Sequence, residues 1–162
     1  MIRNWIDSVR RNHALEHATV TVLLARRGPT RLAGRASGDG FFLLADIDEA
    51  DVLSSAQEAL ERLQRGESGL AVSPLCGTNI AVAGFLAAAA TTSALAGSAR
   101  RSDRFSRAFT AAMLGVIAAQ PVGRLVQKHI TTSPDLADVE IVAIRSVFGS
   151  LKKVQTRPTA AP

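Results

Sequence analysis

The sequence predicts an α+β membrane protein with an N-terminal helix, a small mixed sheet with one helix, a two-helix transmembrane hairpin and a C-terminal strand. Two segments without charged residues, 68–99 and 108–123, enclose an Arg-rich stretch and predict the hairpin. Apolar and β-branched runs bounded by Gly, Asp and Ser predict the strands. The 162 residues leave room for about one compact domain, and the 47% hydrophobic content argues against disorder.

Two helices are expected before the hairpin. Residues 2–27 predict the first, with Asn4 as its N-cap, basic residues in its last turn and Gly28-Pro29 as its stop signal. The second follows Asp48, whose side chain is of the capping type, and extends through Arg65. Its expected apolar face consists of Val52, Leu53, Ala56, Leu60 and Leu63.

Short strands are expected on both sides of the hairpin. Residues 30–36 and 41–47 flank a Ser-Gly-Asp-Gly sequence that has the composition of a tight β-hairpin turn. Residues 70–73 predict another short strand, and the β-branched residues 139–145 predict a strand that returns to the same sheet. Residues 151–162 contain two lysines and two prolines and predict a flexible tail.

The hairpin prediction depends on length and on the placement of small residues. Residues 79–97 and 105–126 are each long enough to cross a hydrocarbon core of about 30 Å at about 1.5 Å per residue. Small residues recur every fourth position on both segments, and such ridges let two helices approach closely in lipid. The ridges are Gly84, Ala88, Thr92 and Ala96 on the first segment and Ala111, Gly115, Ala119 and Gly123 on the second. The alternative is a pair of buried helices in a soluble protein, because Ala favours insertion less than Leu or Ile does.

The predicted organisation is a membrane-proximal α+β region over residues 1–75, the hairpin over 76–128, a return segment over 129–150 and the tail. With an even number of spans, the regions before and after the hairpin lie on one side of the membrane. The positive-inside rule favours a cytoplasmic Arg100–Arg107 loop and external termini. Translocation of about 75 residues without a signal peptide argues against that arrangement, so the orientation stays open.

Composition excludes several classes of protein. The net charge is +5, but the cations are mostly Arg spread along the whole chain, and Tyr is absent, so nucleic acid is not expected as a partner. The single cysteine, Cys76, cannot form an intramolecular disulfide, which excludes a secreted disulfide scaffold. Residues 1–12 carry charge throughout and predict no signal peptide.

The candidate chemistry centres on the sequence His-Ala-Leu-Glu-His at residues 13–17. On a helix, His13 and His17 lie one turn apart on the same face, so both imidazoles can converge on one metal ion. Glu16 lies beside them, three residues after His13. The structural alternative is a helix whose His and Glu side chains pair with each other and with the sheet.

The order of these residues, HxxEH, resembles the inverted zincin motif of the pitrilysin and insulinase metallopeptidases. The resemblance implies that His13 and His17 hold zinc and that Glu16 is the general base, the catalytic residue. It covers five residues of the 162. Those enzymes have larger soluble catalytic domains and take a third ligand from a downstream Glu, whereas no Glu lies between Glu67 and Glu140 here.

Two other residues are candidates for the missing ligand. Cys76 directly precedes the first predicted span and His129 directly follows the second, so both belong to the same membrane face as His13 and His17. Thiolate and imidazole are both good zinc ligands. The structural alternatives are a small buried hydrophobic role for Cys76 and a position at the level of the lipid headgroups for His129.

Three segments are distinctive when taken together, namely His13–His17, the Cys-Gly-Thr-Asn sequence from Cys76, and the Gln-Pro-Val-Gly sequence from Gln120 with the His-Ile-Thr-Thr sequence from His129. In these segments the sequence is similar to an uncharacterised family of bacterial membrane proteins with a domain of unknown function. The resemblance covers roughly residues 10–145 and implies a multi-pass protein of the bacterial cytoplasmic membrane.

Two function classes therefore compete. One is a membrane-associated zinc metallohydrolase of the peptidase type, which acts on a membrane-proximal peptide. The other is a non-catalytic, membrane-anchored structural or interaction module that binds a partner protein, with or without a structural metal. The lipid bilayer is an expected partner in both, and the sequence leaves the oligomeric state open.

Overall fold

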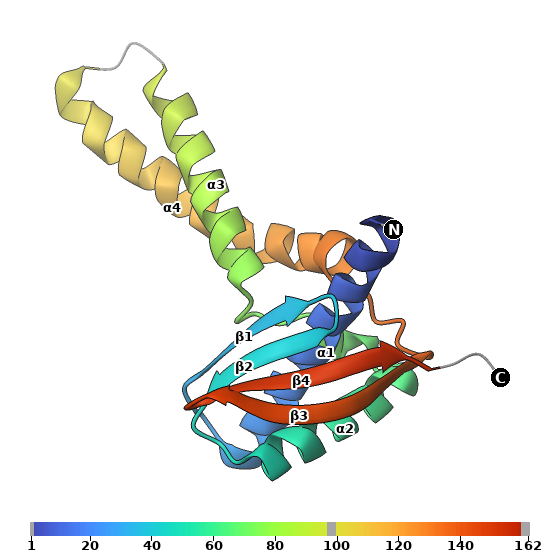
Figure 1. Cartoon of the computed structure of the whole chain (residues 1–162). Coiled ribbons are helices and arrows are strands. Elements are labelled where there is room, and N and C mark those ends of the chain that lie inside the picture. The colour runs from blue at the N-terminus through green and yellow to red at the C-terminus, as the bar shows by residue number, and fades with distance from the viewer. Residues whose placement is uncertain (1, 97–99, 160–162) are drawn as a thin grey trace. The chain divides into compact units, whose positions relative to one another are not determined.

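The computed structural model describes residues 2–96 and 100–159 (Figure 1). The chain divides into two compact units, each of which is described separately. We call residues 1–73 and 128–162 the α+β unit, and residues 74–127 the hairpin unit. The predicted α+β class with a C-terminal strand region is confirmed.

Helix α1 (Ile2–Arg27) contributes a long buried stretch to the core of the α+β unit. It has the predicted bounds, but it begins before Asn4, so the prediction of an N-cap at Asn4 is wrong. Gly28 ends the helix with a φ of 75°, and its N–H donates to the carbonyl of Leu24 at 2.9 Å. Almost every residue between Asn12 and Leu23 is buried, so polar side chains on this stretch require partners inside the protein.

The sheet of this unit is antiparallel throughout, not mixed as predicted. Its spatial order is β1-β2-β4-β3, so β1 lies at one edge. The strands are β1 (Leu32–Ser37), β2 (Gly40–Ala45), β3 (Val139–Phe148) and β4 (Leu151–Pro158). A two-residue turn at Gly38-Asp39 joins β1 to β2, which confirms the predicted hairpin.

Strand β4 occupies residues 151–158, which had been expected to form a flexible tail, and it pairs with both β2 and β3. Its lysines are buried because each ammonium group has partners. Lys152 Nζ donates to the carbonyl of Ala45 at 3.1 Å, and Lys153 Nζ donates to Asp39 Oδ1 at 2.7 Å. Residues 160–162 lie outside the described part of the chain.

Helices α1 and α2 (Glu49–Gln64) cover the same face of the sheet (Figure 1). Asp48 occupies the N-cap position of α2 as predicted, although its side chain makes no capping hydrogen bond. The predicted strand at residues 70–73 is wrong, because Ser68–Ala71 form the 3₁₀ helix η1. The largest fully buried apolar side chains of the core are Leu15, Val22 and Leu23 of α1, Phe41 and Leu43 of β2, Val52 of α2, Leu136 in the segment before β3, and Val154 of β4.

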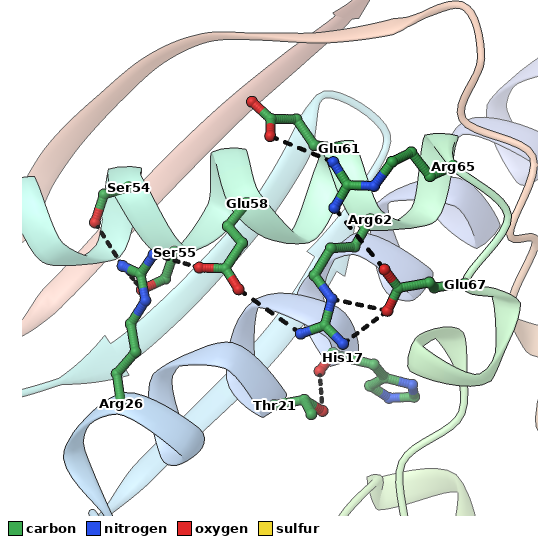
Figure 2. Close-up of polar contacts among 10 residues, drawn as sticks. All are labelled: His17, Thr21, Arg26, Ser54, Ser55, Glu58, Glu61, Arg62, Arg65 and Glu67. Atoms are coloured by element: carbon green, nitrogen blue, oxygen red, sulfur yellow. Dashed lines mark hydrogen bonds and ion pairs between the residues drawn. The ribbon is translucent and has the colours of Figure 1, made fainter.

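Charged side chains join α1 to α2 and to the segment after it (Figure 2). Arg26 of α1 pairs with Glu58 of α2 and donates to Ser54 Oγ at 2.9 Å. Arg62 Nε donates to Glu67 Oε2 at 2.8 Å, and this hydrogen bond holds the pKa of the Glu67 carboxyl below its usual range. Ion pairs this exposed stabilise a fold only slightly.

The hairpin unit contains α3 (Gly77–Leu95) and α4 (Arg101–Val126), and the chain leaves α4 through a π-helical turn, η2 (Gln127–Thr131). Two helical stretches, Gly77–Leu95 and Asp103–Thr131, are long and apolar enough to cross a membrane, each with a mean hydropathy of 1.4. In the 18-residue apolar part of each stretch, only 6% of the residues of the first and 17% of those of the second are buried.

The predicted small-residue ridge forms the helix contact on α4 but not on α3. A Cβ atom at Gly115 would lie 2.8 Å from the backbone of Ala87, so the two helices touch backbone to backbone there. A Cβ at Gly84 would meet no atom within 4 Å, and Ala88, Thr92 and Ala96 are exposed. The α3 ridge therefore lies outside the α3–α4 contact.

A buried amide pair closes the end of the hairpin where the two helices meet the rest of the chain. Gln127 Nε2 donates to Asn79 Oδ1 at 2.8 Å, and Asn79 Nδ2 donates to the carbonyl of Pro74 at 3.0 Å. Gly123 makes room for Asn79, because a Cβ there would fall on the Asn79 amide. Gln127 is buried, whereas Gln120, of the Gln-Pro-Val-Gly sequence, is exposed.

Candidate metal centre in the α+β unit

His13 and His17 lie one turn apart on α1, and their side chains face each other. Their ring centroids are 4.4 Å apart and their ring planes are inclined by 60°. Their potential ligand nitrogens lie within 4.8 Å of each other. His17 is 3% exposed and the side chain of His13 is 18% exposed, so the pair lies largely out of contact with water.

A backbone carbonyl fixes the orientation of each imidazole. His13 Nδ1 is 2.9 Å from the carbonyl oxygen of Thr131, and His17 Nδ1 is 2.9 Å from that of Ala71. Since a carbonyl only accepts, we assign the proton of each neutral ring to Nδ1, so that Nε2 carries the lone pair with which an imidazole coordinates a metal. Histidines that bind metals usually donate their second ring N–H in this way.

Contacts between α1 and the segment around Thr131 hold the Thr131 carbonyl in place. Arg10, one turn before His13, donates from Nη2 to the carbonyls of His129 and Thr132 at 3.1 Å and 3.3 Å. The N–H of Ser133 donates to the carbonyl of Arg10 at 3.1 Å. Residues 129–133 are thereby fastened to α1, which positions the Thr131 carbonyl against His13.

Glu16 lies on the same part of α1, beneath strand β1. It is 7% exposed, and its Oε2 is 3.9 Å from His13 Nε2. A Cβ atom at Gly34 of β1 would fall on the Glu16 carboxylate, so only glycine leaves room for this side chain. The sheet thus holds a buried carboxylate next to the two imidazoles.

The two other candidate ligands, Cys76 and His129, belong to different units of the chain. Cys76, of the hairpin unit, is buried and occupies the N-cap position of α3, where its Sγ accepts from the N–H of Thr78 at 3.4 Å. A helix N-terminus stabilises negative charge on a thiolate. His129, of the α+β unit, has an exposed side chain, and its carbonyl accepts from Arg10.

Gly34, Ala71 and Thr131 are parts of this site that the sequence does not predict. Ala71 and Thr131 contribute backbone carbonyls, which carry no side-chain signal. The Thr131 hydroxyl oxygen is buried and has no hydrogen-bond partner among the described residues. A buried polar atom of this kind is available to a bound water or another ligand.

Comparison with known protein families finds one that spans most of the chain. The chain belongs to the DUF6391 family, a domain of unknown function, whose profile matches residues 8–144. It is 39% identical over 140 residues to an uncharacterised protein of Picosynechococcus sp. strain PCC 7002. This match covers 77% of the chain and 66% of that bacterial relative, so the chain spans just under two thirds of the relative's length. No solved structure matches the chain.

Proposed function

We propose that the protein is a membrane-anchored metalloprotein in which His13 and His17 bind zinc through their Nε2 atoms. The observation that carries this proposal is the pair of Nδ1–carbonyl contacts, both 2.9 Å, which orient two neighbouring imidazoles for coordination. Neutral imidazole suits zinc well, and a buried carboxylate beside the pair favours a divalent cation.

Cys76 is our proposed third ligand. It follows Ala71 by five residues. Because the Ala71 carbonyl contacts His17, an extended chain keeps Cys76 within about 17 Å of that contact. Its position at the N-terminus of α3 favours the thiolate form that zinc requires. His129 is the alternative, because it lies two residues before Thr131, whose carbonyl contacts His13.

We further propose that α3 and α4 cross the bacterial cytoplasmic membrane. Large apolar side chains along both helices are exposed, in contrast to the core helices of soluble proteins. They include Ile80 and Phe85 of α3 and Phe105, Phe109, Leu114, Ile117 and Leu125 of α4, each more than half exposed. Lipid tails would cover these side chains.

The proposed activity is hydrolysis of a membrane-proximal peptide bond or another acyl bond. Zinc supplies Lewis acidity, which polarises a substrate carbonyl and makes a water molecule more acidic. Glu16 accepts the proton as the water oxygen bonds to the carbonyl carbon, and it returns that proton to the leaving group when the scissile bond breaks. The packing of Glu16 against Gly34 fixes the carboxylate for both transfers.

A specific observation favours a structural metal as the second candidate. His17 and Glu16 are 3% and 7% exposed, and structural zinc sites are closed to water. In that case the metal would fasten α1 within the fold and no substrate would be turned over.

The experiment that separates these candidates is metal analysis of the purified, detergent-solubilised protein and its variants. We expect zinc bound to the wild type and lost in His13→Ala and in His17→Ala. Glu16→Gln should retain zinc and thermal stability but lose any hydrolase activity of the parent, since a general base is not a ligand. Cys76→Ser and His129→Ala test the third ligand, because the variant that lacks this ligand should lose zinc.

Absence of zinc from the wild type after expression in zinc-supplemented medium would refute the metal proposal. Zinc retained with equal activity in Glu16→Gln would refute catalysis by Glu16. Retained zinc with a lower melting temperature and no activity in any variant would favour the structural metal.

A further inference from the structure

A groove of about 910 Å³ runs along β1 in the α+β unit. Apolar side chains from three neighbouring elements line it, namely Trp5 and Val9 of α1, Phe42 and Leu44 of β2 and Leu151 of β4, and Arg35 and Asp39 contribute charged groups. Trp5 is 61% exposed and Leu44 is 51% exposed. Exposed apolar surface in a concave site typically marks a binding site.

The groove includes a sheet edge whose backbone groups are unpaired within the sheet. Strand β1 pairs with β2 and is the last strand on its side (Figure 1). Ser37 and Gly40 flank the two-residue turn and therefore form a hydrogen-bonded pair. Because hydrogen-bonded and non-hydrogen-bonded pairs alternate, the N–H and C=O groups of Leu32, Gly34 and Ala36 point away from β2, toward the open edge.

Gly34 connects this edge to the candidate metal centre. It lies in the wall of the groove, and the Glu16 carboxylate packs against its Cα. A chain hydrogen-bonded to Gly34 would therefore pass within a strand's thickness of Glu16, which is 3.9 Å from His13 Nε2. Among the described residues, none outside the sheet hydrogen-bonds to the backbone of Gly34.

We propose that the groove binds an extended peptide segment with apolar side chains at alternate positions, as an additional strand on the edge of β1. The main-chain groups of Leu32, Gly34 and Ala36 hold the peptide backbone, and the apolar walls receive every second side chain. This inference rests on the proposed function, for which it names the substrate class. A lipid chain would fill the same apolar walls but has no N–H groups to pair with the strand.

The test uses a fluorescein-labelled nonapeptide of alternating Leu and Ser, and the full-length Glu16→Gln variant in detergent, so that binding is measured without cleavage. Two further peptides carry N-methyl groups, one on the Leu residues and the other on the Ser residues. In a strand these two sets of N–H groups point to opposite edges, while the Leu side chains fix which face enters the groove. We expect one methylated peptide to bind as the parent does and the other to bind about tenfold more weakly or worse.

Protein variants test the apolar wall. Leu44→Asp should weaken binding of the parent peptide about tenfold or more, because it places a charge in the groove. Val147→Asp is the matched control, since Val147 is 50% exposed on β3 and does not line the groove. Far-UV circular dichroism checks that both variants are folded.

The proposal is overturned if the parent peptide does not bind, if both methylated peptides bind equally, or if the two Asp variants have the same effect. The proposed function fails independently of these results. If the wild-type protein holds no zinc and cleaves no peptide, the proposed hydrolase function is refuted. Peptide binding in the expected pattern would still support the proposed binding groove in that case.

Discussion

At the scale of single residues, the sequence predicts the side chains of the candidate site but not the backbone groups that orient them. The spacing of His13, Glu16 and His17 predicts their common face on a helix, and the two imidazoles lie side by side. The groups that orient them had no such signal, because the carbonyls of Ala71 and Thr131 belong to distant irregular segments. Gly34 is one of 12 glycines, and only its place over Glu16 distinguishes it.

Lys153 is a second residue whose position the sequence does not predict. Its charge predicts an exposed position in a flexible tail, but its side chain is 2% exposed in β4. Its ammonium donates to Asp39 Oδ1 at 2.7 Å and lies 4.3 Å from the centre of the Phe42 ring. The hydrogen bond from Lys153, with one from Ser37, holds the pKa of the Asp39 carboxyl below its usual range.

This pair predicts a pH-dependent contribution to stability. A carboxyl whose pKa is lower in the folded state stabilises the fold above its unfolded pKa of about 4, and this contribution is lost as the pH falls through the folded value. Asp39→Asn should therefore lower the free energy of unfolding at pH 7. The expected loss is only about 1 kcal/mol, because Asp39 is largely exposed and water screens its charge, and it should be smaller near pH 3. Thermal unfolding in detergent at both pH values measures the difference.

Asp135→Asn is the control for that measurement, because Asp135 is 71% exposed and lies 3.8 Å from Arg11. It should change stability little at either pH. An Asp39→Asn effect that is the same at pH 7 and pH 3 would show that the Asp39 carboxylate does not stabilise the fold through its charge.

At the scale of elements, the sequence predicts the helices and strands that have periodic apolar residues or clear turn residues at their ends. Helix α1 and the β1–β2 hairpin are bounded by Gly and turn residues, and both form where expected. The sequence does not predict strand β4, because its adjacent lysines and its proline hide the alternation of apolar and polar residues. These lysines are compatible with a strand only because β4 pairs with β2 on one side and β3 on the other. Residues 70–73 are too few to show a period, and the segment folds as η1 instead.

The α3–α4 contact gives a prediction at this scale. Gly115→Leu should place a side chain into the backbone of Ala87 and lower the stability of the hairpin by about 1–3 kcal/mol. Gly84→Leu is the matched control, because it makes the same change of helix propensity at a position with open space around it. Melting temperatures of the two variants in the same detergent give the comparison, and equal losses would contradict the assigned contact.

At the scale of the whole molecule, the proposed membrane location has a direct biochemical consequence. Two lipid-covered helices hold a protein in the bilayer by their apolar surface, which high pH does not weaken, whereas alkaline carbonate detaches proteins bound by charge. We therefore expect the protein to sediment with membranes after carbonate extraction and to appear in the supernatant only with detergent. Release of most of the protein by carbonate alone would show that α3 and α4 do not cross the membrane.

The α+β unit is built from two stretches of chain, with the entire hairpin between them. Strand β4 lies between β2 and β3, yet it is the last of the four strands to leave the ribosome. Until then β2 has only one neighbouring strand, and the carbonyl that orients His13 is reached only after α4 has been made. Biosynthesis therefore makes α3 and α4 available for the proposed membrane insertion before the contact that orients His13 can form, so the proposed metal site would be completed afterwards.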